Sequence, residues 1–501
     1  MSAPKAPETA RAFHDPVLRM HNIHSCAFPP VESSSQIRFP SDILPPVPRR
    51  KGIPGARHSV LQRVEHFEMR RALESLWIIV LVGLLLRLVV VAFVYQDLLS
   101  PDMDHWSFGW ETGRIARSLA LGEGFANPLF HKTGLTAWMA PAYPWLLACV
   151  FRLAGIYTKA SALGILSLNC LFSALTSLPV YYLARNSLGT AVAAPTAWFW
   201  GLFPYAFDIG ATRVWDTCLS ALLLTTLLAL TVHLVQARSP GHWAAYAVVW
   251  GIAALTNPAL LSVFPWLVGW VCYRLHNAKR DWVKPCSLCV LLVLVIVSPW
   301  MVRNYRVFHR FIPLRDNFWL EMWVGNNGDT SDWFPIWVHP TGNDQELAEF
   351  ERLGEIGYMD QKRAQTVAFI RSHPGPFLLT IFRRLLFTWT GFWSFNRHYL
   401  AENAFDPPNI FFSTSLTILM LLGLWRTFHE APAFAVPFAI VLLIYPVVYY
   451  LTHAAIYYRH PIDPEIVVLA VLGLHRGFHK QGLRQDRPEK LEPGSELHMP
   501  A

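Results

Sequence analysis

Long apolar runs dominate this chain and constrain its fold more than any other feature. About twelve apolar segments follow one another between short polar loops, and many approach the roughly 20 residues that a helix needs to cross a bilayer. With 53% hydrophobic residues and a mean hydropathy of +0.30, the chain is too apolar for a set of soluble domains. The sequence therefore predicts an all-α polytopic membrane protein.

Basic residues between the apolar segments predict the topology. Residues such as Arg185, Arg238 and Arg426 belong in the cytoplasm by the positive-inside rule, which requires that segments 144–154 and 376–393 do not cross. We expect about ten spans in a bundle of 10–12 helices, with both termini cytoplasmic. The expected helical segments are residues 76–95, 144–154, 160–183, 191–207, 217–235, 243–255, 259–273, 285–300, 376–393, 411–424, 434–451 and 466–474.

This topology divides the chain into a membrane domain and two tails. Residues 1–72 are rich in Pro, Ser and charge and are expected to form a disordered cytoplasmic tail, while residues 477–501 form a second one. The membrane domain spans residues 73–476. Its expected outer loops, at residues 96–140, 208–216, 301–409 and 457–464, contain the main polar clusters.

The net charge of +8 does not indicate a nucleic-acid partner, because the basic residues sit in short clusters between apolar runs, as membrane topology requires. Cys286 and Cys289 form a CxxC pattern inside an apolar run, where core cysteines are expected rather than a metal or redox site.

Two further features concern the first apolar span and the outer loop that follows it. Arg87 interrupts the first apolar span, and an arginine at that depth faces a protein interior or cavity, pairs internally or snorkels to the surface. The stretch 107–122 has apolar residues at helical spacing, including Phe108, Ile115 and Leu119. We expect it to form an amphipathic helix on the outer membrane surface.

A series of short motifs occurs in a characteristic order along the chain: IARSLALGEGF, APAYPWLLA, RVWDT, GIAALTNP, SPWMVRNYRVF and YYRHPIDPEIVVLA. Together they resemble the GT-C class of membrane glycosyltransferases, in particular the family 39 relatives of protein O-mannosyltransferases and aminoarabinose transferases. The resemblance covers residues 76–474. It implies a multi-pass enzyme of the bacterial inner membrane and a GT-C-like helical bundle.

The resemblance also implies a reaction. The enzyme would take a sugar from a polyprenyl-phosphate donor and transfer it to a glycan, lipid or protein acceptor on the outer side, with a carboxylate of the first outer loop as catalyst. Asp102, Asp104 and Glu111 are the candidates here. The acidic pair that the family places about nine residues before the arginine of the IAR motif is replaced by Phe108 and Gly109.

The chemistry of the reaction requires a base for the acceptor and positive charge for the departing phosphate. Glu111 also fits an ion pair with Arg114 at i+3, and Asp102 or Asp104 fits a helix N-cap. Asp104 and Glu111 are favoured because each lies nearer the helix that would line the cavity.

The donor is expected to contact residues of three later segments. Arg213 and Asp216 match an arginine and an acid that lie near the donor in the resembling family, although Asp216 also suits a helix N-cap. Arg303, Arg306 and Arg459 are placed on the outer side against the positive-inside trend. They suit a lipid phosphate, or contact with ordinary headgroups of membrane lipids.

Two alternatives stay open at this point. His453 and His460 would serve as ligands if the site held a divalent metal, but histidines at this spacing also occur as ordinary polar residues. A transporter or flippase of lipid-linked glycans would also use outer cations and a membrane cavity. Transporters are often built from internal repeats, and none is visible in this sequence.

Overall fold

The computed structural model describes residues 75–94, 108–237, 239–328, 336–395, 397 and 410–475. This part of the chain is almost entirely helical, apart from one β-bridge between Ala126 and Leu135. The all-α prediction is confirmed. The helices are α2 (Leu76–Val89), α3 (Glu111–Ala120), α4 (Ala142–Ala154), α5 (Lys159–Leu175), α6 (Ser177–Leu188), α7 (Thr190–Gly201), α8 (Pro204–Thr212), α9 (Thr217–Leu234), α10 (Pro240–Thr256), α11 (Phe264–Asn277), α12 (Val283–Phe308), α13 (Phe318–Gly325), α14 (Asp344–Ser372), α15 (Pro374–Thr390), α17 (Ile410–Glu430), α18 (Pro432–Ile444), α19 (Val447–Leu451), α20 (Ile456–Arg459) and α21 (Asp463–Leu474).

Seven helical stretches within the described residues are long and apolar enough to cross a membrane. They are Leu76–Phe93, Lys159–Leu188, Thr217–Leu234, Pro258–Asn277, Val283–Phe308, Ile410–Glu430 and Pro432–Leu451. The other expected spans correspond to shorter helices, α7 and α21 with 12 residues each and α10 with 17. Leu81, Leu291 and Leu421 are each more than half exposed on helix surfaces, as expected where lipid rather than water surrounds a bundle.

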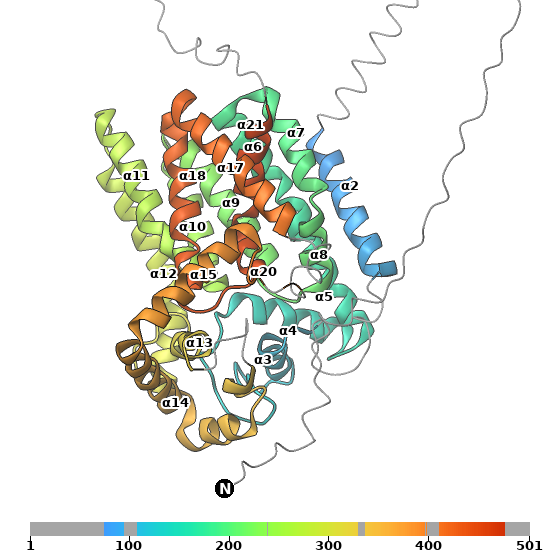
Figure 1. Ribbon diagram of the computed structural model, residues 1–501, viewed down its shortest axis with the longest axis vertical. Helices are drawn as coiled ribbons and strands as arrows, with labels where there is room; N and C mark the ends of the chain where they lie inside the picture. The colour runs from blue at the N-terminus through green and yellow to red at the C-terminus, as the bar shows by residue number, and fades with distance from the viewer. Residues whose placement is uncertain are drawn as a thin grey trace, which may run out of the picture.

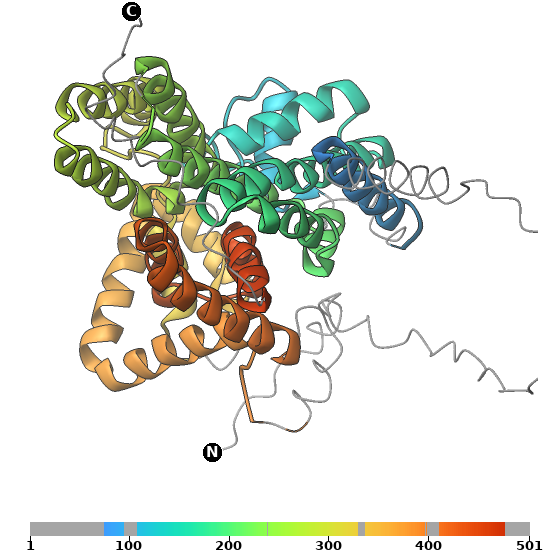
Figure 2. The same ribbon diagram turned by 90° about the horizontal axis from the view of Figure 1, so that it is seen from above.

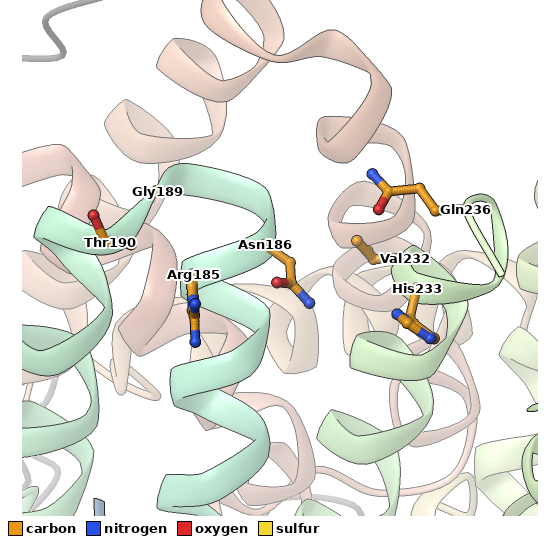
Figure 3. Close-up of a pocket in the computed structure, with 7 residues that line it drawn as sticks. All are labelled: Arg185, Asn186, Gly189, Thr190, Val232, His233 and Gln236. Atoms are coloured by element: carbon orange, nitrogen blue, oxygen red, sulfur yellow. The ribbon is translucent and has the colours of Figure 1, made fainter. Parts of the chain in front are cut away.

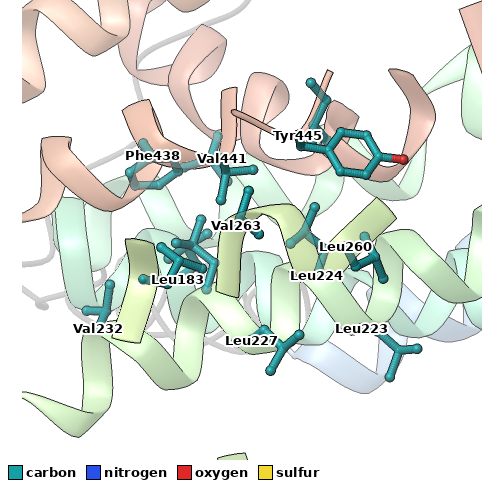
Figure 4. Packing of buried hydrophobic residues seen from close by; sticks show 14 of the residues in the cluster. Leu183, Leu223, Leu224, Leu227, Val232, Leu260, Val263, Phe438, Val441 and Tyr445 are labelled. Atoms are coloured by element: carbon teal, nitrogen blue, oxygen red, sulfur yellow. The ribbon is translucent and has the colours of Figure 1, made fainter. Parts of the chain in front are cut away.

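Aliphatic and aromatic side chains fill the interior of the bundle. Leu183 of α6 and Leu224 and Leu227 of α9 lie in one cluster with Val263 and Phe438 (Figure 4). The cluster joins the middle of the chain to its C-terminal helices, since α18 packs against α9 and α11. Seen from above, these C-terminal helices lie beside the green ones (Figure 2).

The segment expected as one span at 191–207 is two helices, α7 and α8. Pro204 begins α8, and a proline disfavours helical conformation at the residue before it. The carbonyls of Trp200 and Gly201, at the end of α7, accept hydrogen bonds of 3.4 and 2.9 Å from Arg87. Arg87 also donates to the hydroxyl of Ser173 at 3.0 Å and is fully buried. The sequence left several interpretations of Arg87 open. The structure supports the one in which Arg87 faces the protein interior.

The labelled helices α3, α4, α13 and α14 lie at the lower end of the bundle in Figure 1, which we call the covered end. We call the opposite end the open end. The 13-residue α4 lies across the covered end instead of running along the bundle (Figure 1).

The helix expected on the membrane surface is α3, and its position differs from the prediction. Seven of its 10 residues are buried, because it packs against α4 on one side while Ile115 and Leu119 join an apolar cluster that also includes α13 and α14 residues. Its amphipathic pattern reflects packing inside the covered end rather than contact with lipid headgroups.

The orientation of the bundle can be tested with reporter fusions. Fusions after Arg185, Lys284 and Arg426 should report the cytoplasm, because clustered basic residues stay inside, whereas fusions near Pro128 and Gly328 should report the outside. Fusions after Arg238 and near Asp406, which lie outside the described residues, should report the cytoplasm and the outside respectively. A cytoplasmic signal at Gly328 would contradict a site on the outer side.

Candidate functional site

The N-terminal end of α3 lies directly against the segment that connects α8 to α9. Gly109 has φ of +75°, and a Cβ built on it would lie 2.6 Å from the carbonyl oxygen of Val214, so only glycine permits this approach. Glu111 occupies the first turn of α3. The two segments that the sequence singled out, the first loop and the RVWDT motif, therefore meet at the covered end. Asp102 and Asp104 lie outside the described residues.

Asp216 stands at the N-terminus of α9 but does not cap the helix with its side chain. Its carboxylate accepts a hydrogen bond of 3.0 Å from Ser220. Burial raises the pKa of Asp216, while hydrogen bonds from Ser220 and Asn257 and the charge of Arg315 oppose the rise. The carboxylate thus lies in a polar group made from α9, the end of α10 and the loop before α13.

Glu321 and His453 form a second polar group next to Arg315. The Nε2 atom of His453 lies 2.6 Å from one oxygen of Glu321, and the other oxygen accepts a 2.8 Å hydrogen bond from Asn317. Burial alone raises the pKa of Glu321, but His453 and Arg315 outweigh that effect and bring the pKa to about 2. Because the charge of Arg315 acts on both Asp216 and Glu321, its guanidinium links the two groups.

Aromatic side chains line this part of the covered end. The guanidinium of Arg213 lies 4.8 Å from the ring centre of Tyr457, and the backbone carbonyl of Arg213 accepts a 2.7 Å hydrogen bond from Asn169. Tyr449 and Tyr458 stack with ring centres 4.7 Å apart. Aromatic and cationic groups together suit a ligand that combines a sugar ring with an anion.

Arg459 is buried next to these tyrosines. Its Nε donates to Asp463 at 2.9 Å and its Nη1 to the carbonyl of Thr388 at 3.0 Å. Among the described residues its Nη2 has no hydrogen-bond partner. Arg459 lines a narrow pocket with Thr388, Tyr449 and Tyr458. Two nitrogens of the guanidinium therefore serve the fold, while Nη2 is buried without a hydrogen-bond partner in the described part of the chain.

Arg303 and Arg306 have different environments although both are on α12. Arg303 donates to the carbonyls of Thr136 at 2.6 Å and Phe125 at 2.9 Å, so it anchors the first loop. Arg306 is exposed in the last turn of the helix, where its charge favours the C-terminus. Donor binding by Arg303 and Arg306 stays a prediction.

Two carboxyl groups, Glu355 and Asp316, lie beside the part of the first loop that Arg303 also contacts. Glu355 accepts hydrogen bonds from the hydroxyl of Thr136 at 2.5 Å and the backbone N–H of Ala137 at 2.6 Å. Burial raises the pKa of its neighbour Asp316 to about 6 and that of Glu355 well above its usual value. The hydrogen bonds of Glu355 to Thr136 and Ala137 anchor the loop.

The described residues contain no group of three or more His, Cys, Asp or Glu side chains that could hold a metal ion. His453 is bound to Glu321, and His460 lies 3.1 Å from Asp463. A separate pocket of about 450 Å³ lies at the open end, lined by residues that include Arg185, Asn186 and His233 (Figure 3). The 18-residue α9 separates it from Asp216 by about 27 Å, so it is not part of the candidate site.

Sequence reasoning missed Arg315 and Glu321. One signal for Glu321 was present: it is the sole charged residue in the aromatic run FWLEMWVG, and a carboxylate among apolar residues needs a partner. The contribution of Arg315 depends on tertiary contacts and had no comparable signal.

Residues 139–302 match the family model described as dolichyl-phosphate-mannose-protein mannosyltransferase, which confirms for this segment the resemblance carried by the sequence motifs. No curated protein sequence matches the chain.

Solved structures of low identity are similar to the chain. The apo oligosaccharyltransferase of Archaeoglobus fulgidus has 13% identity and a TM-score of 0.48, covering 80% of this chain and 50% of that one. A structure of the same archaeal enzyme with Zn and sulfate has 12% identity and a TM-score of 0.44, covering 79% and 48%. ArnT from Cupriavidus metallidurans bound to undecaprenyl phosphate has 15% identity and a TM-score of 0.34, covering 78% and 77%. The chain spans about half the length of the archaeal enzyme.

Proposed function

We propose that this chain is a membrane glycosyltransferase. It takes a sugar from a polyprenyl-phosphate donor and transfers it to a glycan, lipid or protein acceptor on the outer side of the bacterial inner membrane. The observation that carries the proposal is the match of residues 139–302 to the mannosyltransferase family model. The grouping of carboxylates, arginines and aromatic side chains at the covered end supports it.

The reaction needs a base for the acceptor and positive charge for the departing phosphate. A carboxylate of the first loop, among Asp102, Asp104 and Glu111, removes the proton from the acceptor hydroxyl as its oxygen attacks the anomeric carbon. The bond from that carbon to the phosphate oxygen breaks, and polyprenyl phosphate leaves. Positive charge from Arg213, Arg459 and Arg315 stabilises the departing phosphate.

Supplying purified protein with a panel of labelled polyprenyl-phosphate sugars tests the proposal and identifies the sugar. We expect one donor to lose its label to an acceptor extracted from bacterial envelopes. If labelled lipid-linked sugars instead cross a vesicle membrane intact, the protein is a flippase and the proposal fails.

Removal of divalent cations tests the role of a metal. Treatment with EDTA should leave transfer within about twofold of its normal rate, because arginines supply the charge that a metal would otherwise provide. The measurement is the initial rate of transfer before and after chelation. A loss that Mg²⁺ or Mn²⁺ restores would contradict this expectation and show that transfer needs a divalent metal.

A further inference from the structure

The pocket of about 450 Å³ at the open end lies where two membrane-spanning stretches end (Figure 3). The stretch Lys159–Leu188 ends with α6, and the stretch Thr217–Leu234 ends with α9. Arg185 belongs to the last turn of α6 and His233 to the last turn of α9, and both residues line the pocket. A helix that crosses a bilayer ends close to the lipid headgroups. The pocket therefore lies at the level where headgroups meet the protein.

The side chains that line the pocket offer positive charge and hydrogen-bond donors. Arg185 contributes a guanidinium, Asn186 and Gln236 contribute amides, and Thr190 contributes a hydroxyl. The described lining includes no aspartate or glutamate, so no carboxylate there repels an anion. A volume of about 450 Å³ far exceeds the ~30 Å³ that one water molecule occupies in the liquid. The pocket therefore has room for a polyatomic anion such as a phosphate group with its substituents.

Arg185 differs from two other arginines at the open end, whose guanidinium groups bind helix C-termini. Arg280 donates to two carbonyls just after α9 at 2.7 and 2.6 Å. Arg426 donates to two carbonyls at the end of α21 at 3.0 and 2.6 Å. Arg185 is exposed, and in the part of the chain that the structure describes its side chain has no hydrogen bond or ion pair. Its guanidinium is therefore available to a ligand in the pocket.

The N-terminus of α7 adds a second source of positive potential. Gly189 is the N-cap of this 12-residue helix and has no side chain to cap it, and Gly189 and Thr190 both line the pocket. The N–H groups of a first helical turn favour an anion. The C-termini of α6 and α9 carry the opposite partial charge, but the N–H of Gly189 and the guanidinium of Arg280 already donate to carbonyls there. Arg185 and the start of α7 together make the pocket favourable for an anion.

We propose that this pocket binds the phosphate group of a membrane phospholipid. Arg185 supplies the charge and a forked donor for the phosphate oxygens, and Asn186 and Thr190 supply further hydrogen bonds. A soluble phosphate offers the same chemistry. The position at the ends of two membrane spans favours a lipid, since basic pockets between transmembrane helices suit anionic headgroups. The inference does not depend on the transferase activity, because the length of α9 separates the pocket from Asp216.

The test measures the binding of a short-chain phosphatidylglycerol to the full chain in a neutral detergent by isothermal titration calorimetry. We expect saturable binding. Arg185→Gln should weaken it about 10- to 100-fold, the value of a charge-assisted hydrogen bond to phosphate. Arg185→Lys should weaken it less, because the charge remains while the forked geometry is lost. Thermal unfolding of both variants should be normal, since the side chain of Arg185 is exposed.

Arg274→Gln is the matched control. Arg274 also lies in the last turn of a helix at the open end, α11. It does not line the pocket, and its guanidinium lies 5.7 Å from the ring centre of Trp270. The control should bind the lipid with an affinity within about twofold of normal. Equal weakening by Arg185→Gln and Arg274→Gln would indicate general attraction of the lipid to a basic surface and would overturn the inference, as would the absence of saturable binding.

Inorganic phosphate, used as a second probe in the same titration, distinguishes the two sources of the phosphate group. We expect it to bind at least ~10-fold more weakly than the lipid, because the acyl chains of the lipid add apolar contacts with the surface of the bundle. Arg185→Gln should weaken the binding of both probes. If inorganic phosphate binds as tightly as phosphatidylglycerol, the pocket takes a soluble phosphate, and the phospholipid is overturned as its ligand.

Discussion

One amide substitution among Asp102→Asn, Asp104→Asn and Glu111→Gln should reduce turnover by about 10²–10⁴-fold, the usual contribution of a general base. Donor binding and folding should be unchanged, because an amide is nearly isosteric with a carboxylate and asparagine remains a good N-cap. The measurement is single-turnover transfer from the labelled donor, with donor affinity determined separately. We expect the effect at Asp104 or Glu111, since the start of α3 lies against the Val214 carbonyl beside Asp216.

Glu123→Gln is the matched control for these variants. Glu123 belongs to the same loop, but it is bound to Lys132 at 2.8 Å and Asn127 at 3.0 Å on the surface. Its substitution should leave turnover within about twofold, because surface pairs of this kind contribute little. If all three test variants transfer sugar at the normal rate, the base lies elsewhere, and Asp216 becomes the first residue to replace.

The membrane fold was predictable because lipid imposes a simple rule on sequence. A segment that crosses a bilayer must satisfy its backbone internally and remain apolar over its length, so the apolar runs identified most helices directly. The break between α7 and α8 also had a signal in Pro204. The burial of α3 did not, because Ile115 and Leu119 have the same helical spacing whether the helix packs against lipid or against α4.

The candidate site was predictable from the sequence only in part. Motif order identified the first loop, Arg213 and Asp216, and the structure places these segments at one end of the bundle. The role of Arg303 as a loop anchor depends on the carbonyls of Phe125 and Thr136, more than 160 residues earlier in the chain. Backbone acceptors carry no sequence signal, so a charged residue that binds them cannot be distinguished from one that binds a phosphate.

The structure changes how the role of Arg459 has to be tested. Arg459 and Asp463 form an ion pair whose side chains are both 0% exposed, and removing one partner of such a pair leaves a buried charge uncompensated. Arg459→Ala alone should therefore lower the free energy of unfolding by about 3–5 kcal/mol. A loss of donor binding in that variant would not distinguish a phosphate ligand from a folding defect.

Replacing both partners separates the two effects. The double variant Arg459→Met with Asp463→Asn removes both charges, and it should recover most of the lost stability because neither buried charge remains unpaired. Its affinity for labelled donor should still fall about 10- to 100-fold, the value of a charge-assisted hydrogen bond to phosphate. The measurements are thermal unfolding in detergent and equilibrium donor binding. The same double change at Arg310 and Asp360, an exposed pair with a 2.6 Å contact, is the control and should alter neither quantity measurably. A stable Arg459→Met, Asp463→Asn protein that binds donor with normal affinity would assign Arg459 to the fold alone, and the donor phosphate would then have to be sought near Arg213 and Arg315.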